Sequence, residues 1–233
     1  MALTSIVVPL YNEGEAPRRL IAHLLGLEGL EEVILVDSSD DPLSRQKVSS
    51  LQAICPEKLR ILQGSERGRA VQMNLGADRA DGGILLFLHC DSRLPANALA
   101  LVERAIDSGY EWGRFDIRLD ARGRVYRLIE TMINLRSRFR CIATGDQGIF
   151  VKTELFRECG GYPAIALMED IAFSNLLKRR SRPCLIKTPL LTSARRWQNR
   201  GIIPTVLLMW RLRFLYWCGA SPEKLYRLYG EER

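Results

Sequence analysis

The stretch "GILLFLHCDS", Gly83 to Ser92, decides the fold. Its apolar residues, Ile84 to Leu88, are followed without a spacer by His89, Cys90 and Asp91. A short apolar run of this kind predicts a strand buried on both faces of a parallel sheet. The polar residues then lie at the carboxyl end of that strand, where open α/β sheets bind their ligands. Either the chain simply reaches the surface there, or these groups bind something.

Similar strand patterns precede this stretch, and helical patterns separate them. The other predicted strands are "TSIVVPL" (4–10), "EEVILVD" (31–37) and "KLRILQ" (58–63). Four helices are also predicted. The first begins near Pro17 and has an apolar face of Leu20, Ile21, Leu24 and Leu25, and the second has an apolar face of Val48, Leu51 and Ile54. The third and fourth cover residues 68–80 and 94–107. Strands that alternate with helices form right-handed βαβ units. We therefore expect an α/β fold with a mostly parallel central sheet flanked by helices.

The second half is less regular, but its elements can be assigned. The expected elements are a strand within 110–127, a helix over 124–138, a turn and strand over 143–152, a helix over 168–180 and a strand over 184–191. We expect one domain over residues 1–200 and a C-terminal amphipathic helical segment over 201–233. The run from Ile202 to Trp217 is too short to span a bilayer and contains Arg211 and Arg213. It suits an anionic membrane surface, a homodimer contact or packing on the domain.

The charge is distributed unevenly along the chain. The net charge is +7, yet residues 171–233 contain 13 Lys or Arg and only 3 Asp or Glu. Such a basic segment favours an anionic partner, namely phosphates, nucleic acid or an anionic membrane face. A solvated basic surface is the alternative.

The cysteines indicate a reducing compartment. All 6 are scattered, without a Cys-x-x-Cys pair, and the N-terminal sequence does not resemble a signal peptide. We expect reduced, mostly buried thiols and no structural zinc site. The predicted location is the cytoplasm, with peripheral contact at the inner membrane face if the C-terminal helix binds lipid.

Several nucleotide-binding motifs are missing after the first predicted strand. Tyr11, Asn12, Glu13 and Gly14 stand where a dehydrogenase would have G-x-G-x-x-G. The chain also lacks a Walker lysine, a G-x-S-x-G elbow and the Gly-rich basic loop of a sugar nucleotidyltransferase. Polar clusters end three predicted strands, at 11–13, 37–41 and 89–91. Carboxylates are therefore the expected nucleotide contacts.

Six motifs occur in the order found in family 2 inverting glycosyltransferases of the GT-A fold. They are "SIVVPLYNE", "VDSSDD", "GRAVQMNLGA", "FLHCDS", "TGDQGIFV" and "MED", and the resemblance covers Thr4 to Thr192. The chain most resembles a small bacterial subgroup with LHxD and GDQ motifs, labelled arsenosugar biosynthesis glycosyltransferases. The resemblance implies a hexosyltransferase that uses a nucleoside-diphosphate sugar as donor, with a UDP-sugar as the first candidate. It also implies a hydroxyl acceptor and Mn²⁺ or Mg²⁺ as the metal. It implies no nucleic acid partner.

The same resemblance implies a donor site in the first half. It places Asp37 near the base or ribose, where the alternative is a turn-former at a strand end. The residues expected in the same pocket are Pro9, Tyr11 and Glu13. Arg67 or Arg69, at the start of a helix, would contact uracil or phosphate. The alternative for Arg67 is a solvated residue at a helix start.

Asp91 matches the metal-binding aspartate of the family's Asp-x-Asp motif. The resemblance implies that its carboxylate holds the cation against the diphosphate, since hard cations prefer oxygen ligands. His89 replaces the first acid of that motif. It is a metal ligand, a hydrogen-bond partner of ribose or phosphate, or a space-filling residue. Cys90 is expected to point into the core, because successive strand residues alternate.

The resemblance assigns the catalytic base to Asp170, beside Glu169. Neighbouring carboxylates raise a pKa, which suits a base, although an acid before a helix is also an ordinary N-cap. Asp146 is a second candidate for the base or an acceptor-orienting group, and Gln147 is expected to contact sugar hydroxyls. Gly145 and Gly148 are expected to let the backbone approach the donor sugar.

"SARRWQNRG" (193–201) follows the last predicted strand and loosely resembles the family's Arg-Trp element. Arg195 or Arg196 would stabilise the leaving diphosphate, and Trp197 would stack on a sugar. The leading Gln-x-x-Arg of the family pattern is not present here. Two other functions stay open: a nucleotidyltransferase that releases pyrophosphate, and a non-enzymatic protein that binds nucleic acid or lipid through the basic tail.

Overall fold

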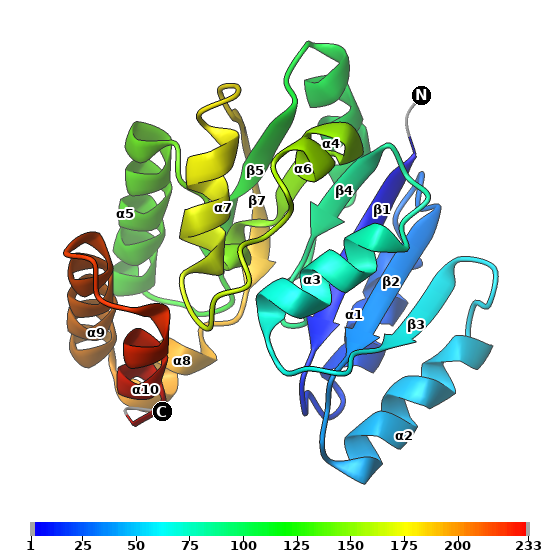
Figure 1. Cartoon of the computed structure of the whole chain (residues 1–233), viewed down its shortest axis with the longest axis horizontal. Helices are drawn as coiled ribbons and strands as arrows, with labels where there is room; N and C mark the ends of the chain where they lie inside the picture. Colours follow the sequence, from blue (N-terminus) through cyan, green and yellow to red (C-terminus); the bar gives the residue numbers. More distant parts are fainter. Residues whose placement is uncertain (1–2, 232–233) are drawn as a thin grey trace.

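A seven-stranded sheet organises the molecule, in the strand order β3-β2-β1-β4-β6-β5-β7 (Figure 1). The computed structural model describes residues 3–231. The strands are β1 (Thr4–Leu10), β2 (Glu32–Asp37), β3 (Leu59–Gln63), β4 (Ile84–Phe87), β5 (Trp112–Leu119), β6 (Ile149–Lys152) and β7 (Cys184–Thr192). β6 is antiparallel to both its neighbours, and the other pairs are parallel. The predicted α/β fold with a mostly parallel sheet is confirmed.

Helices cover both faces of this sheet. They are α1 (Ala16–Leu24), α2 (Pro42–Ser50), α3 (Arg69–Asp78), α4 (Ala98–Asp107), α5 (Arg124–Arg140), α6 (Thr153–Glu158), α7 (Glu169–Leu177), α8 (Arg195–Arg200), α9 (Ile202–Trp217) and α10 (Pro222–Glu231), with short 3₁₀ turns η1 (Leu51–Ala53) and η2 (Gly145–Gln147). The sequence patterns missed α6 and α8, whereas α9 and α10 lie in the predicted C-terminal helical segment. Ile54 was expected to be buried but is 50% exposed, because the helix ends before it.

Two hydrophobic cores lie on opposite faces of the sheet. Ile6 and Leu86 belong to the core that includes residues of α1 and α4, whereas Val7 and Phe87 belong to the core with α3, α6 and α7. Adjacent strand residues thus serve different cores, as the alternation of side chains along a strand requires. Burial on both faces explains why these strands are continuous apolar runs.

Strand β5 pairs with β6 through only Trp112 and Gly113, so much of its β6-facing edge lacks a strand partner. Helix α5 takes over this role with polar side chains. The amide of Asn134 accepts from Ile117 N at 2.9 Å and donates to Ile117 O at 3.1 Å. The carboxylate of Glu130 accepts from Leu119 N at 2.6 Å. The polar side of α5 therefore faces the protein and holds it against the sheet.

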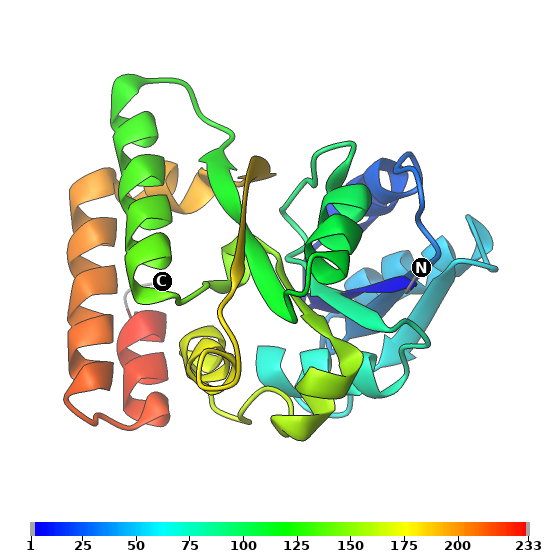
Figure 2. The same cartoon turned by 90° about the horizontal axis from the view of Figure 1, so that it is seen from above.

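The C-terminal helices pack against the rest of the chain. Leu208, Leu212 and Leu225 form one cluster with Leu167 and Met168, which immediately precede α7. Figure 2 shows α5, α9 and α10 grouped at one end of the molecule. No helix within the described chain is long and apolar enough to cross a bilayer.

All six cysteines lie in the described chain and are unpaired. Cys55 and Cys90 are buried, but Cys141, Cys159 and Cys184 are half-buried and Cys218 is exposed. The expectation of mostly buried thiols was therefore wrong, although the absence of disulfides agrees with the sequence pattern.

The role of Asn134 can be tested by Asn134→Ala. The substitution leaves the N–H and C=O of Ile117 without their partners, so we expect a loss of about 1 to 3 kcal/mol in the free energy of unfolding, measured by urea denaturation. Thr131→Ala on the exposed side of the same helix is the matched control and should change stability by less than about 0.5 kcal/mol. Equal losses in the two variants would contradict the role of Asn134.

Candidate active site

The carboxyl ends of β1 and β2 are tied together by a polar network. Asn12, in the left-handed region with φ 53°, donates its backbone N–H to Ser39 Oγ at 2.8 Å. Its side-chain amide donates to Asp40 at 2.5 Å, and the Tyr11 hydroxyl donates to the same carboxylate at 2.8 Å. Gln72 lies beneath, and its amide donates to Leu10 O and Val36 O. This network fixes one wall of the edge.

Asp37 is buried within this wall. One carboxylate oxygen accepts from Ser39 N at 3.0 Å and from Ser39 Oγ at 2.5 Å. The other oxygen, Oδ2, is buried and has no hydrogen-bond partner within the described chain. Buried polar atoms are normally paired, so this oxygen is suited to accept an N–H or O–H from a ligand.

Tyr11 and Arg67 stack beside Asp37. The Arg67 guanidinium lies 4.1 Å from the centre of the Tyr11 ring, a cation–π contact. Arg67 therefore lies beside the turn that follows β1, and its contact with a nucleotide stays a prediction. Pro9 is also at this edge, but its side chain is buried.

The turn after β4 begins earlier than expected. β4 ends at Phe87, and Ser92 N donates to His89 O at 3.1 Å, so the polar residues occupy a turn rather than the strand itself. Cys90 packs into the core, as predicted. Asp91 is exposed, but the surrounding protein limits its hydration and, together with the charge of Asp146, raises its pKa.

His89 packs against the turn that contains Gly145. A Cβ on Gly145 would lie 2.5 Å from His89 Nε2, so any side chain at position 145 would collide with the imidazole. Burial lowers the pKa of His89 to about 4, and the charges of Arg69 and Arg196 act in the same direction. The imidazole is therefore neutral at pH 7 and fills the space that the missing side chain leaves.

Glu169 and Asp170 begin α7, directly after Met168, whose φ is 69°. Glu169 is buried and forms an ion pair with Arg69, with 3.0 Å between Oε1 and Nε. Asp170 accepts from Gly145 N at 2.9 Å. Burial raises the pKa of Asp170, which Arg69 and the backbone donors oppose. Asp170 is in the first turn rather than at the N-cap, so the N-cap alternative does not hold.

The residues of the turn η2 and the glycine after it have different environments. Asp146 is half-buried, and its Oδ1 has no hydrogen-bond partner among the residues described. Gln147 is fully buried, and its Oε1 accepts from Thr144 N at 3.0 Å in a capping box. Gly148 has φ 59°, and a Cβ added to it would lie 2.8 Å from Leu190 in the core; its place beside the donor sugar stays a prediction. Position 148 requires glycine because its backbone lies in the left-handed region.

Two arginines of α8 lie close enough to Asp91 for their charges to act on its carboxylate. The charges of Arg195 and Arg196 oppose the rise in the pKa of Asp91. Arg195 also lines a cavity of about 220 Å³ together with Glu13 and Asp91. Trp197 instead packs on a hydrophobic cluster around β5 and α5, which leaves the expected sugar stacking without support.

Arg136 was not predicted from the sequence. It lies on α5, and its guanidinium is close enough to Asp146 and Asp170 for their charges to act on its pKa, which burial lowers. Its Nη2 is buried without a hydrogen-bond partner in the described part of the chain. An arginine in an arginine-rich helix gives no sequence signal for this position, because only packing brings it to the site.

Comparison with known proteins identifies the family. Residues 5–158 match the model of Glycosyl transferase family 2, and the chain belongs to this family. Uncharacterized protein MT1568 of Mycobacterium tuberculosis (strain CDC 1551 / Oshkosh) is 33% identical over 113 residues, which cover 45% of this chain and 33% of that protein. The chain thus spans about a third of that relative's length.

Solved structures share the fold at low sequence identity. Staphylococcus aureus TarS (1–349) has a TM-score of 0.67 at 18% identity, over 82% of this chain and 60% of that one. The mannosyltransferase PcManGT from Pyrobaculum calidifontis, in complex with GDP-Man and Mn²⁺, has a TM-score of 0.64 at 20% identity, over 91% of this chain and 60% of that one. This chain therefore spans about 60% of either structure.

The contact between His89 and Gly145 generates a test. Gly145→Ala should destabilise the protein by about 1 to 3 kcal/mol, because the added methyl group overpacks the imidazole. In a His89→Ala background the same change should cost less, and urea denaturation of the four proteins measures the coupling. Gly230→Ala, where an added Cβ meets nothing within 4 Å, is the control. Equal costs in both backgrounds would show that the two residues do not interact.

Proposed function

We propose that the protein is an inverting glycosyltransferase that transfers a sugar from a nucleoside-diphosphate sugar to a hydroxyl acceptor. The observation that carries the proposal is the convergence of Asp37, Asp91 and Asp170 on one sheet edge. Each carboxylate has a different environment: Asp37 is buried with one unpaired oxygen, Asp91 is exposed, and Asp170 is held beside Arg69. Such differences allow three distinct roles at one site.

The donor base would bind at Asp37. Its unpaired Oδ2 accepts hydrogen bonds, and uracil offers an N–H on its edge, which supports a UDP-sugar. Tyr11 and Arg67 would form the side of this pocket, with Glu13 between it and Asp91. The neighbour TarS has been crystallised with UDP-GlcNAc, which agrees with a donor of this class.

Asp91 would hold Mn²⁺ or Mg²⁺. Among residues 3–231, no group of three or more His, Cys, Asp and Glu could hold a metal ion. This fits a cation held by one or two carboxylates and shared with substrate phosphates, as is usual for Mg²⁺. Asp146, with its unpaired oxygen, is the nearby second carboxylate. When bound, the cation neutralises charge on the diphosphate. His89 contributes to ligation in this proposal only if its imidazole turns away from Gly145.

Asp170 would act as the base. It would accept the proton of the acceptor hydroxyl as the oxygen attacks the anomeric carbon on the face opposite the diphosphate. Its raised pKa makes the carboxylate a better proton acceptor, and the Gly145 N–H holds it in one orientation. Arg69 would keep Glu169 ionised beside it, and Arg196 would face the departing diphosphate.

Donor and metal binding can be tested by thermal shift. UDP with Mn²⁺ should raise the unfolding midpoint, since a ligand that binds the native state stabilises it by mass action. GDP, CDP, dTDP, Mg²⁺ and EDTA complete the screen. In Asp91→Asn the increment from Mn²⁺ should disappear, whereas Asp107→Asn, an exposed carboxylate at the end of α4, should retain it. A full Mn²⁺ increment in Asp91→Asn would rule out the metal assignment.

The base can be tested with Asp170→Asn. We expect about a hundredfold or greater loss of transfer with unchanged UDP binding. Because burial raises the pKa of Asp170, ionisation is unfavourable in the fold, so the variant should be no less stable at pH 7. The wild-type rate should fall as the pH drops through this raised pKa, since protonated Asp170 cannot accept a proton.

Two results would contradict this assignment. Wild-type turnover in Asp170→Asn, with loss in Asp146→Asn, would move the base to Asp146. Release of pyrophosphate from a nucleoside triphosphate, instead of a nucleoside diphosphate from a sugar donor, would identify a nucleotidyltransferase.

A further inference from the structure

Helix α5 has polar side chains, together with Ile129, toward the protein and an apolar stripe toward solvent. Asn134 and Glu130 hold β5, and Arg138 forms an ion pair with Asp116. The exposed large apolar side chains of α5 follow a 3-4-3-4 spacing: Val125, Leu128, Met132, Leu135 and Phe139. Arg124 and Arg140, at the two ends of the helix, are exposed as well. This spacing forms one stripe along a helix. The stripe is not needed for packing, because the opposite side of the helix already provides it.

Helix α9 repeats the pattern. Its exposed large apolar side chains are Ile203, Leu207, Trp210, Phe214 and Trp217, again spaced as one stripe, and Arg211 is exposed beside them. Trp217 is 82% exposed, and Phe139 of α5 is 84% exposed. The buried side of α9, with Leu208 and Leu212, packs against Leu167 and Met168, which precede α7. Both helices thus have an apolar face that nothing in the described chain covers.

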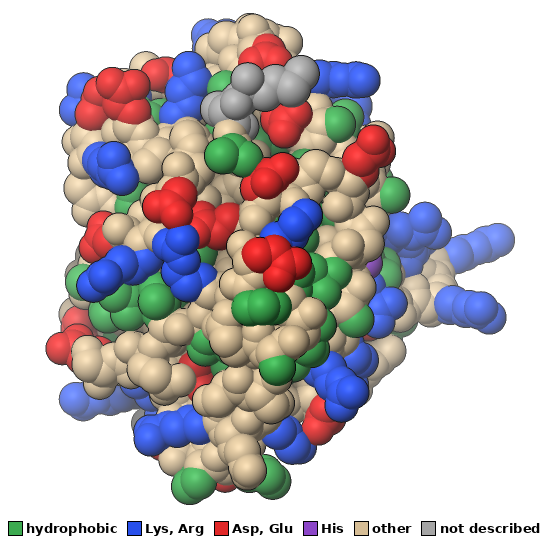
Figure 3. Space-filling view, turned by 90° about the vertical axis from the view of Figure 1, so that its right-hand side faces the viewer, with side chains coloured by type: hydrophobic (Ala, Val, Ile, Leu, Met, Phe, Trp, Pro, Cys, Tyr) green, Lys and Arg blue, Asp and Glu red, His purple; other side chains and the backbone are tan. Residues whose placement is uncertain are grey.

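The two stripes lie at the same end of the molecule. Figures 1 and 2 both show α5 and α9 side by side at this end, and Ile202 packs on the cluster that contains Ile129 of α5. Ten of the fifteen exposed large hydrophobic residues in the described chain are on these two helices. The opposite side of the molecule, shown in Figure 3, has acidic and basic side chains interspersed. We call the ten residues the apolar face.

The segments that carry the apolar face are rich in arginine, although Arg136, Arg195 and Arg196 lie toward the candidate site and Arg138 pairs with Asp116. Residues 122–140 contain six arginines and a single acid, and residues 195–217 contain five arginines and no acid. The single acid, Glu130, is buried and bonded to Leu119 N and Arg127. Exposed apolar and aromatic side chains beside arginines match the interface of an anionic bilayer, where rings enter the headgroup layer and arginines contact phosphates.

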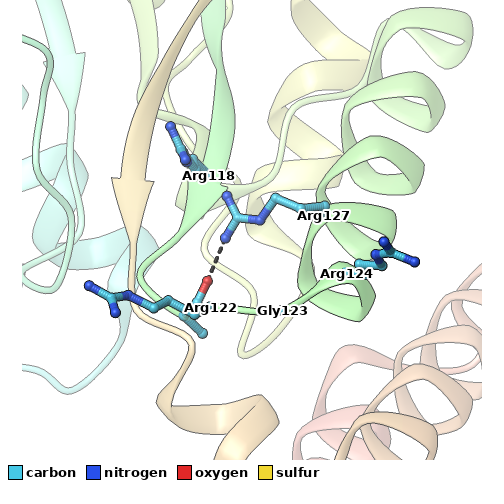
Figure 4. Close-up of a pocket in the computed structure, with 6 residues that line it drawn as sticks. Arg118, Arg122, Gly123, Arg124 and Arg127 are labelled. Atoms are coloured by element: carbon cyan, nitrogen blue, oxygen red, sulfur yellow. Dashed lines mark hydrogen bonds between the residues drawn. The ribbon is translucent and has the colours of Figure 1, made fainter.

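An arginine cavity adjoins the start of the stripe on α5. It has a volume of about 390 Å³ and is lined by Arg118, Arg122, Arg124, Arg127, Ala121 and Gly123. Figure 4 shows Arg127 reaching from α5 to the chain that follows β5, where it donates to Ala121 O. Arginines around one cavity repel each other unless an anion lies between them. Headgroup phosphates would supply such anions next to the apolar face.

We propose that the apolar face and the arginine cavity dock on the surface of an anionic lipid bilayer. The charge decides between this partner and a second copy of the chain. Pairing two copies through this face would bring the exposed Arg122, Arg124 and Arg140 of one copy close to those of the other, whereas anionic lipid neutralises them. The proposal concerns binding to the membrane surface and does not depend on sugar transfer.

The test is co-sedimentation of the full chain with vesicles. We expect binding to equal mixtures of phosphatidylcholine and phosphatidylglycerol, and weaker binding to phosphatidylcholine alone or at high salt. The triple variant Trp210→Ser, Phe214→Ser, Trp217→Ser should bind at least about tenfold more weakly, because it removes aromatic groups that enter the interface. Arg122→Ala with Arg124→Ala should also weaken binding at least about tenfold, since each arginine near an anionic surface contributes roughly a factor of five.

The matched control is Leu43→Ser with Ile54→Ser, which removes exposed apolar residues from the other end of the molecule. It should bind like the wild type, and unchanged thermal midpoints should show that all variants are folded. Absence of binding to anionic vesicles, or equal loss in the control, would overturn the proposal. So would a stable dimer in analytical ultracentrifugation that the triple variant dissociates, because the face would then be an interface between copies. Vesicle binding with no response to nucleotides would leave this proposal intact and contradict the proposed function.

Discussion

The repulsion among carboxylates at one sheet edge is the constraint on which the site depends. The charge of Asp146 contributes to the raised pKa values of Asp91 and Asp170, and Glu169 is buried beside Asp170. Such a group would be unstable without compensation. Arg69 supplies this compensation. Its guanidinium forms an ion pair with Glu169, and its positive charge also attracts the carboxylates of Asp170 and Asp146. A cation or a proton from a substrate would relieve the remaining repulsion, which is how this edge is prepared for chemistry.

The backbone around these carboxylates is fixed by close packing. Gly145 gives its N–H to Asp170, and its missing side chain leaves room for His89. One glycine thus connects the turn after β4 with the start of α7. The neutral imidazole fills this position without adding charge. The departure from the Asp-x-Asp pattern therefore has a structural explanation in the packing of His89 against Gly145.

Helix α5, in the second half of the chain, has different roles on its two sides. Toward the sheet, α5 supplies hydrogen bonds that β5 lacks, and Arg136 reaches the carboxylates. Toward solvent, the same helix has an apolar stripe that continues the one on α9. Arg136, which lies near the carboxylates, and the apolar stripe are therefore carried by the same helix. A protein docked through this face would keep its catalytic edge at a fixed position relative to the lipid surface.

The sequence by itself determined the alternation of strands and helices and the edge at which the polar groups collect. These features are local, since an apolar run and the residues after it are neighbours in the chain. Only the tertiary structure decided which charges meet. Arg69 and Glu169 are far apart in sequence, and periodicity could not show that Arg136 points toward the carboxylates. Periodicity marks an apolar stripe on α5 but not the side that faces the protein. The unpaired edge of β5 settles that choice, because its backbone groups require the polar side.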